Sequence, residues 1–155
     1  MTSSFDEIFS CFLLKVTDYK FINEPEDVTN AFMIGWLHSA LSKPYIRRVF
    51  SNIEINDDTR TINFQIKNSV DAKTDIDYIQ ELVASAMVVE WMEPKVKSVL
   101  NMAQMYGGKE QKFFSQAAHL KENKAMLDDQ KAEIRKMIRD HGYIYNSYIG
   151  ERNDT

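Results

Sequence analysis

The chain has 155 residues, of which 44% are hydrophobic and 12% aromatic, so we expect one domain with one modest core. Its 19 basic and 23 acidic residues give a net charge of -4, which argues against a strongly basic nucleic-acid clamp. No apolar run approaches the roughly 18 residues that span a bilayer, and the N-terminus lacks the basic region of a signal peptide. The single cysteine, Cys11, excludes an internal disulfide framework and is interpreted as a core residue. We therefore expect a soluble protein that is not secreted.

Two helices are predicted in the first third of the chain. Apolar residues at positions 5, 8, 9, 12, 13 and 16 predict a helix of about three turns within residues 5–19. Pro25, followed by Glu26 and Asp27, is a favourable helix start, and the helix is expected to run from Glu26 to Leu41. Its predicted face consists of Val28, Phe32, Leu37 and Leu41, with Met33 and Trp36 near the edges. Ser42 and Pro44 are expected to end it.

Residues 52–66 alternate between apolar and polar side chains around an Asp-Asp-Thr-Arg turn. This period of two predicts a half-buried β-hairpin. Because an isolated hairpin is at best marginally stable in water, we expect it to lie on the helices or to pair with another chain.

A long helix is predicted from Asp75 to about Tyr106, with one interruption. Pro94 has no amide to donate to the carbonyl of Glu90, and it disfavours the helical conformation of Glu93. We therefore expect a kink or a break at Pro94.

Gly107 and Gly108 follow this helix, at the place where a C-terminal cap adopts positive φ. They predict a chain reversal, after which a second long helix begins near Gln111. Its apolar positions follow heptad spacing and are Phe113, Ala117, Leu120, Leu127, Ile134 and Ile138. The two helices are expected to form an antiparallel hairpin, with Phe113 and Phe114 closing its end near Met102, Met105 and Tyr106.

Lys124 and Lys131 interrupt the heptad seam, so the segment 121–136 is expected to face water or a partner. A solvated helix with internal ion pairs, such as Asp128 with Lys131, is the favoured interpretation.

Three tyrosines and two isoleucines follow Gly142, which is too apolar for a disordered end. Two interpretations stay open: that residues 143–149 cover the protein's own hairpin, or that they form an arm that adds to a neighbouring subunit.

The search for catalytic or ligand motifs gives little. His38, His119 and His141 lie on different segments, and neither zinc spacing nor a phosphate-binding glycine loop is present. The acidic pairs Asp57-Asp58, Asp75-Asp77 and Asp128-Asp129 are interpreted as a turn, a helix start and an exposed face. Ser85 and Ser115 lack the strained turn of a serine nucleophile. No enzyme activity, metal or cofactor is predicted.

The segment 43–48 brings Lys43, Arg47 and Arg48 together with Tyr45, a cluster able to make weak contacts to DNA or to an acidic partner. The favoured alternative is that these cations meet carboxylates of this chain or of a neighbour.

Three segments together resemble a family. They are 84-ASAMVVEWMEPKVKS-98, 107-GGKEQKFFSQAAHLKE-122 and 143-YIYNSYI-149. This pattern is similar to that of head-to-tail connector (neck or adaptor) proteins of tailed bacteriophages. The resemblance covers the C-terminal half, from Asp75 onward.

The resemblance implies a structural virion protein, made in the host cytoplasm, that assembles as a dodecameric ring beneath the portal protein. Such a ring would extend the DNA channel and dock the tail or its stopper protein, while DNA passes without specific binding. A ring uses two different side surfaces of each subunit, and the acidic balance fits a channel that does not hold DNA. No membrane contact is implied. A tail terminator or stopper, and a small helical protein-binding regulator, are the alternatives.

We thus expect a mainly α fold: a helical bundle built on a long antiparallel helical hairpin, with a small β-hairpin and an extended C-terminal arm. Residues 1–142 would form a single helical connector domain, and residues 143–155 the arm. Candidate subunit or partner contacts are Tyr143, Ile144, Tyr145, Tyr148, Ile149, Ile62 and Phe64. The structural core of the helical hairpin is expected to comprise Trp91, Pro94, Gly107, Gly108, Phe113, Phe114 and Leu120.

Overall fold

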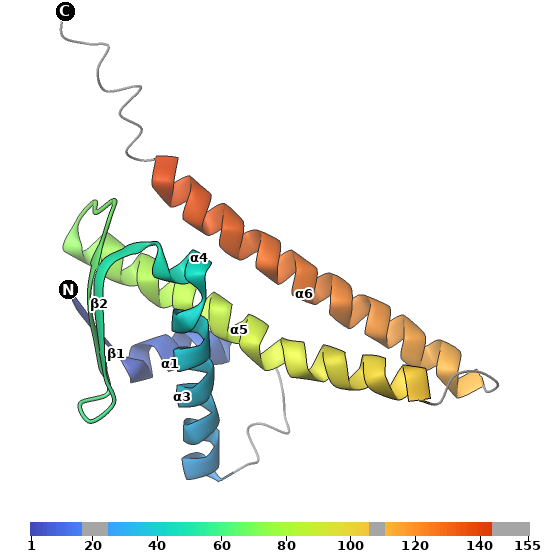
Figure 1. Cartoon of the computed structure of the whole chain (residues 1–155). Coiled ribbons are helices and arrows are strands. Elements are labelled where there is room, and N and C mark those ends of the chain that lie inside the picture. The colour runs from blue at the N-terminus through green and yellow to red at the C-terminus, as the bar shows by residue number, and fades with distance from the viewer. Residues whose placement is uncertain (17–24, 106–110, 144–155) are drawn as a thin grey trace, which may run out of the picture.

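A computed structural model of the chain describes the backbone of residues 1–16, 25–105 and 111–143, and the side chains of residues 1–16, 25–98 and 121–142. The fold is mainly helical, as predicted, with a small antiparallel sheet (Figure 1). The elements in chain order are β1 (Thr2–Ser4), α1 (Phe5–Lys15), α3 (Glu26–Ser42), α4 (Pro44–Arg47), β2 (Phe50–Asn56), β3 (Thr61–Ile66), α5 (Ala72–Met105) and α6 (Gln111–Tyr143). None of the described helices combines the length and apolar character that crossing a membrane requires.

The sheet has the strand order β1-β3-β2, and both pairings are antiparallel. The predicted hairpin is present as β2 and β3, with its inward-facing side chains Ile53, Ile62 and Phe64 buried. The sequence did not predict β1, because three residues are too few to show alternation. This strand places the N-terminal amine beside β3, where it donates to the carbonyl oxygen of Phe64 at 3.0 Å.

Helix α1 begins at a capping box. The hydroxyl of Ser4 accepts from the amide of Glu7 at 3.2 Å, and the Glu7 carboxylate accepts from the Ser4 amide at 2.9 Å. This backbone hydrogen bond from Ser4 is the largest cause that lowers the pKa of Glu7. The helix ends at Lys15, and residues 17–19 of the predicted helix lie outside the described residues. Cys11 is half-buried and packs against the core, and its burial raises the thiol pKa.

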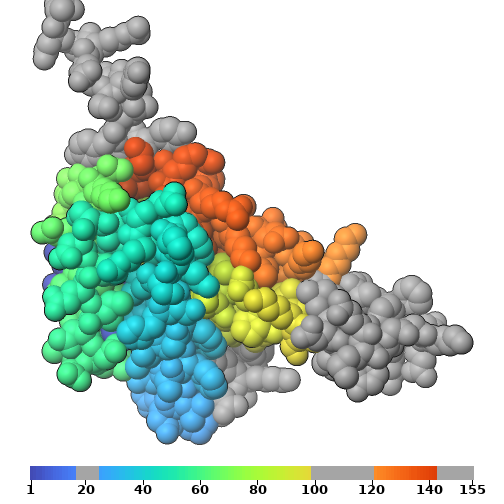
Figure 2. Space-filling view, in the orientation of Figure 1, coloured from blue at the N-terminus to red at the C-terminus, as the bar shows by residue number. Residues whose placement is uncertain are grey.

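Helix α3 has the predicted start but not the predicted face. Met33, Leu37, Ala40 and Leu41 are buried. By contrast, the predicted core residues Val28 and Phe32 are 36% and 54% exposed, so this part of the predicted face is wrong. The reason is positional: the C-terminal half of α3 reaches the body of the protein, and its N-terminal half projects away from it (Figures 1 and 2).

Helix α5 begins three residues before the predicted start. The carboxylate of Asp71 accepts from the amides of Lys73 and Thr74, both at 3.0 Å, and so caps the first turn. These contacts, with Thr74 first, lower the pKa of Asp71. Pro94 lies inside the helix, which continues to Met105, so the alternative of a break was wrong. Met92 and Val96, on either side of Pro94, are both buried, so α5 stays packed across the proline.

Contacts between described side chains join α5 to α6, among them the following three. Tyr78 stacks on His141, the side-chain amide of Gln130 donates to the Ser85 carbonyl oxygen at 3.4 Å, and Lys131 pairs with Glu93 at 2.6 Å. Helix α6 begins at Gln111, in agreement with the prediction of a start near this residue. The predicted turn at Gly107-Gly108 lies outside the described residues, and so do the side chains of Phe113 and Phe114.

The core lies where α1, α3, α5 and the inner face of the sheet meet. Phe12 of α1 contacts Trp36 of α3, with ring centroids 5.6 Å apart. The largest fully buried side chains are Phe5, Phe12, Ile8, Leu37, Ile46, Ile62, Ile79, Leu82, Met87 and Ile134. This apolar burial is the dominant stabilising contribution to such a fold.

Candidate functional site

The three cations of the predicted basic cluster 43–48 have different surroundings in the structure. Lys43 caps the end of α3 and pairs with the Glu90 carboxylate of α5 at 3.0 Å. This contact is the largest cause that raises the pKa of Lys43. Arg47 and Arg48 are exposed at the end of α4. The favoured alternative, that these cations meet carboxylates of this chain, therefore holds for Lys43.

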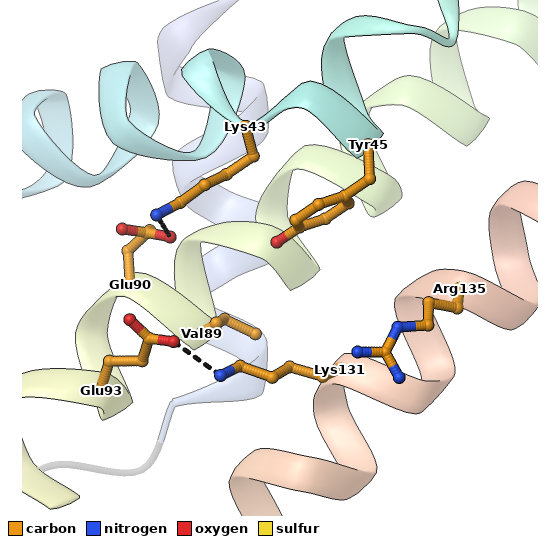
Figure 3. Close-up of a pocket in the computed structure, with 7 residues that line it drawn as sticks. All are labelled: Lys43, Tyr45, Val89, Glu90, Glu93, Lys131 and Arg135. Carbon is orange, nitrogen blue, oxygen red and sulfur yellow. Dashed lines mark hydrogen bonds and ion pairs between the residues drawn. The ribbon is translucent and has the colours of Figure 1, made fainter.

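Lys43 belongs to a cleft of about 280 Å³ that we call the ion-pair cleft (Figure 3). Its lining residues come from α3–α4, α5 and α6, and they are Lys43, Tyr45, Val89, Glu90, Glu93, Lys131 and Arg135. In addition to Lys43, the Ser39 hydroxyl donates to Glu90 at 2.6 Å. The cleft thus lies where three elements are tied together by charged side chains.

The second ion pair of the cleft joins α5 to α6. Lys131 donates to Glu93 at 2.6 Å, and Lys97 lies 3.7 Å from the same carboxylate. The hydrogen bond from Lys131 is the main reason that the pKa of Glu93 is lowered. The predicted pairing of Lys131 with Asp128 is therefore wrong, because Lys131 reaches across to α5. Both carboxylates of the cleft are held by lysines, so neither is a free general base.

A second cleft, of about 220 Å³, is lined by Arg48, Lys67, Asn68, Tyr78 and His141 among others; we call it the His141 pocket. The His141 ring lies 3.9 Å from the Tyr78 ring at an interplanar angle of 13°. Burial raises the pKa of Tyr78 to about 12 and lowers that of His141, while the charge of Asp75 opposes the shift of His141. These shifts keep both rings uncharged near neutral pH.

Asp75 is buried next to this pocket. Its carboxylate accepts from the Ser69 hydroxyl at 2.5 Å and from the Val70 amide at 3.0 Å. It therefore fixes the chain that enters α5, in agreement with its interpretation as a helix-start residue. Among the described residues, none that lines the His141 pocket carries a carboxylate.

The histidines do not form a shared site in the described part of the chain. His38 pairs with Asp57 of the hairpin turn at 2.9 Å, with both side chains exposed, and His141 lies in its own pocket. The side chain of His119 lies outside the described residues. Among the described residues, no group of three or more His, Cys, Asp and Glu side chains is placed to hold a metal ion.

A third hollow, of about 220 Å³, lies between α1, α5 and α6, and we call it the Trp91 groove. Its apolar lining consists of Val88, Trp91, Met92, Val96 and Met126, and its polar lining of Lys15, Lys95, Asn123 and Gln130. The ammonium of Lys95 lies 3.8 Å from the centre of the Trp91 ring, within cation–π distance. Trp91, predicted as hairpin core, is therefore half-buried at the edge of a groove.

Of the predicted contact residues, two are buried in the core and the others have side chains outside the described part of the chain. Ile62 and Phe64 are 0% and 2% exposed, so their side chains pack in the chain's own core and offer no surface to a partner. Tyr143 ends α6, but its side chain lies outside the described residues, as do Ile144, Tyr145, Tyr148 and Ile149. The side chain of Leu120 is also outside this part, and Pro94 lies within α5.

Sequence reasoning missed Arg60, which organises the hairpin turn. Arg60 has a φ of 53°, its guanidinium donates to Asp6 at 2.8 Å and to Asn30 at 3.1 Å, and it lies over the rings of Phe5 and Phe9. Three distant segments thereby meet at one side chain. Nothing in the local pattern indicates this role, because the partners are 30 or more residues away.

The chain was compared with protein-family models, with curated proteins and with solved structures, and no match was found in any of the three comparisons.

Proposed function

We propose that the chain is a structural subunit of a tailed-bacteriophage head-to-tail connector, which assembles as a ring beneath the portal, extends the DNA channel and docks the tail or its stopper. The assignment to this class comes from the resemblance of residues 84–98, 107–122 and 143–149 to connector proteins. The physical support comes from the surface of α6.

The observation that carries the proposal is how little of α6 this chain covers. Between Lys121 and Gly142, the buried side chains are Leu127, Ile134 and His141, spaced seven residues apart. Most of the other side chains of this stretch are exposed, including Met126 at 55%. A long helix held by one narrow seam leaves much of its surface for other subunits, which suits an assembly protein.

The proposed mechanism gives α5 the role of a rigid support. From Leu82 to Val89 every side chain of α5 is buried, and the ion-pair cleft ties the helix to α3–α4 and to α6. In this proposal the two long helices form an antiparallel hairpin that is closed by the Gly107-Gly108 turn. Residues 143–149 then act as an arm that engages a neighbouring subunit.

In this proposal, the charge of the subunit allows DNA to pass through the channel without being held. The described cations Lys43 and Lys131 are paired with carboxylates, and the whole chain carries a net charge of -4. Cationic contacts to phosphate anchor DNA, so an overall acidic balance favours DNA that slides without being held.

Quantitative mass spectrometry of purified phage particles tests the proposal. We expect about one copy of this chain per portal subunit, because stacked connector rings of matching symmetry have equal copy numbers. A clearly different ratio would favour a stopper or a tail terminator. Absence from purified particles would contradict the proposal and would favour a regulator that binds a cellular partner through the segment 121–136.

A further inference from the structure

One face of α3 is apolar and exposed. Val28, Ala31, Phe32 and Gly35 follow the spacing i, i+3, i+4, i+7, and all four are exposed; we call them the α3 stripe. On a solvent-facing helix this side is normally polar. A Cβ atom built at Gly35 meets nothing within 4 Å, so the stripe has room for a close neighbour. The stripe therefore has the pattern of a helix-packing face without a described partner.

The stripe is held outward. The buried face of α3 begins at Met33, and the N-terminal half of the helix projects from the body (Figures 1 and 2). The ring of Phe32 stacks on that of Trp36 with centroids 5.8 Å apart at 17°. Since Trp36 in turn contacts Phe12 of the core, Phe32 is supported at a fixed place on the surface.

The Trp91 groove has matching chemistry. Val88, Met92 and Val96 are buried and form an apolar floor, while Trp91 is half-buried and Met126 is exposed. An aromatic and a methionine at the margin of an apolar hollow are typical of sites that receive a side chain of a partner.

The charges at the two surfaces are of opposite sign. Glu26 and Asp27, both exposed, form the first turn of α3 beside the stripe. The groove is lined by Lys95, which is exposed and lies over the Trp91 ring, and by Lys15, whose ammonium pairs with Glu81. The stripe is apolar with an acidic end, and the groove is apolar with a basic side chain at its edge. The two surfaces are therefore complementary in polarity and in charge.

We infer that the α3 stripe of one copy of the chain packs into the Trp91 groove of the next copy. The inference rests on the proposed function, because it names the contact that joins neighbouring subunits of the ring. The two surfaces are different and lie on different elements, so the contact is heterologous. Repeated head-to-tail contacts of this kind close into a ring when the rotation between copies permits it.

Cysteine cross-linking tests the pairing of the two surfaces. Two variants are made in a Cys11→Ala background: Val28→Cys on the stripe and Met126→Cys beside the groove. Each is purified alone and treated with a short bismaleimide at high protein concentration. We expect dimers when the two variants are mixed and about tenfold fewer with either variant alone, because a heterologous contact brings unlike surfaces together. Equal dimer yields in all three samples would show that the contact does not pair these surfaces.

The chain with both cysteines is then tested in phage particles. A ladder of cross-linked multimers in particles supports the inference directly. If the chain is present in particles but neither the particles nor the mixed purified variants cross-link, the inference is wrong while the proposed function stands. If the chain is absent from particles, the proposed function fails, and the mixed purified variants alone decide the inference.

An exchange of charge between Asp27 and Lys95 distinguishes the loss of a specific contact from a general loss of folding. Asp27→Lys should weaken the association by about tenfold, because it places like charges near Lys95, and adding Lys95→Asp should restore it. Phe32→Asp should weaken it by about thirtyfold, as expected for an aromatic anchor. Circular dichroism checks that each variant folds. The inferred packing places Asp27 of one copy near Lys95 of the next. If the folded double variant did not regain association, this placement would be contradicted.

Discussion

The middle of α5 and the described part of α6 are both helical, but the chain buries them very differently. From Leu82 to Val89 every α5 side chain is buried, whereas α6 buries one side chain in seven between residues 121 and 142. The difference follows from position: α1, α3 and α6 pack around α5, and α5 is the main support of α6. A helix surrounded on all sides becomes apolar all round, and a helix with one neighbour needs only a narrow seam. Stability is therefore expected to reside in α5, and assembly surface in α6.

The largest expected effect is that of Leu82→Ala in α5. Leu82 is 0% exposed, so its truncation leaves a cavity and should lower the free energy of unfolding by about 2–5 kcal/mol. Met126→Ala on α6 is the matched control and should change it by less than about 0.5 kcal/mol. Denaturant unfolding followed by circular dichroism measures both. Similar losses in the two variants would remove the contrast between the helices.

Ile134→Ala acts on the α6 seam and should have a smaller, local effect. Ile134 is 1% exposed, and its truncation should cost about 2 kcal/mol, near the low end for buried aliphatic residues because α6 has room to adjust. Native-state hydrogen exchange should show faster exchange in α6 and unchanged exchange at residues 82–89. The exposed Glu133→Ala is the control. If α5 and α6 amides accelerated together, the two helices would open as one unit.

His141 should make stability depend on pH. Burial lowers its pKa below the ordinary value of 6.5, so the unfolded chain binds the proton more readily than the folded one. Stability from this group is present above about pH 6.5 and decreases as the pH falls below it. His141→Phe keeps a ring against Tyr78 and should flatten this part of the profile, measured as unfolding free energy between pH 7 and 5. An unchanged slope would contradict the role assigned to His141.

The smallest expected effect comes from the ion pair between the helices. Lys131→Met removes the partner of Glu93, and because both side chains are partly exposed, the loss should be about 0.5–1 kcal/mol at neutral pH. Lys131 lowers the pKa of Glu93 from its ordinary 4.5. The contribution is therefore present above about pH 4.5 and lost as the pH falls through the lowered pKa.

Lys124→Met is the matched control for the ion pair. Lys124 occupies the equivalent position one heptad earlier on α6 and is exposed, so its replacement should leave both stability and acid sensitivity unchanged. A loss equal to that of Lys131→Met would mean that general charge on α6, and not the contact with Glu93, is responsible.

Sequence patterns predicted where the helices and strands lie better than they predicted which of their faces are buried. The alternation around Ile62 and Phe64 located the hairpin, and Pro25 with two acidic residues located the start of α3, because these signals are local. The same patterns did not show which apolar face is covered: Phe32 has the spacing of a core residue yet lies outside. Burial depends on where a helix meets the rest of the fold, and local spacing does not contain that information.

The candidate surfaces were predicted only in part. Lys43, Lys131 and Trp91 were singled out from the sequence, but their partners were not identified. Glu90 lies 47 residues from Lys43, and Glu93 lies 38 residues from Lys131, so the pairs exist only after folding. Arg60 was missed for the same reason. Long-range ion pairs leave no periodic trace in a single sequence.

Imaging of phage particles by electron cryomicroscopy tests the central proposal most directly. The proposed function predicts density for this chain as a ring between the portal and the tail, with the long helices resolved as pairs. Particles with a complete head-to-tail junction and no density for this chain would contradict the proposal.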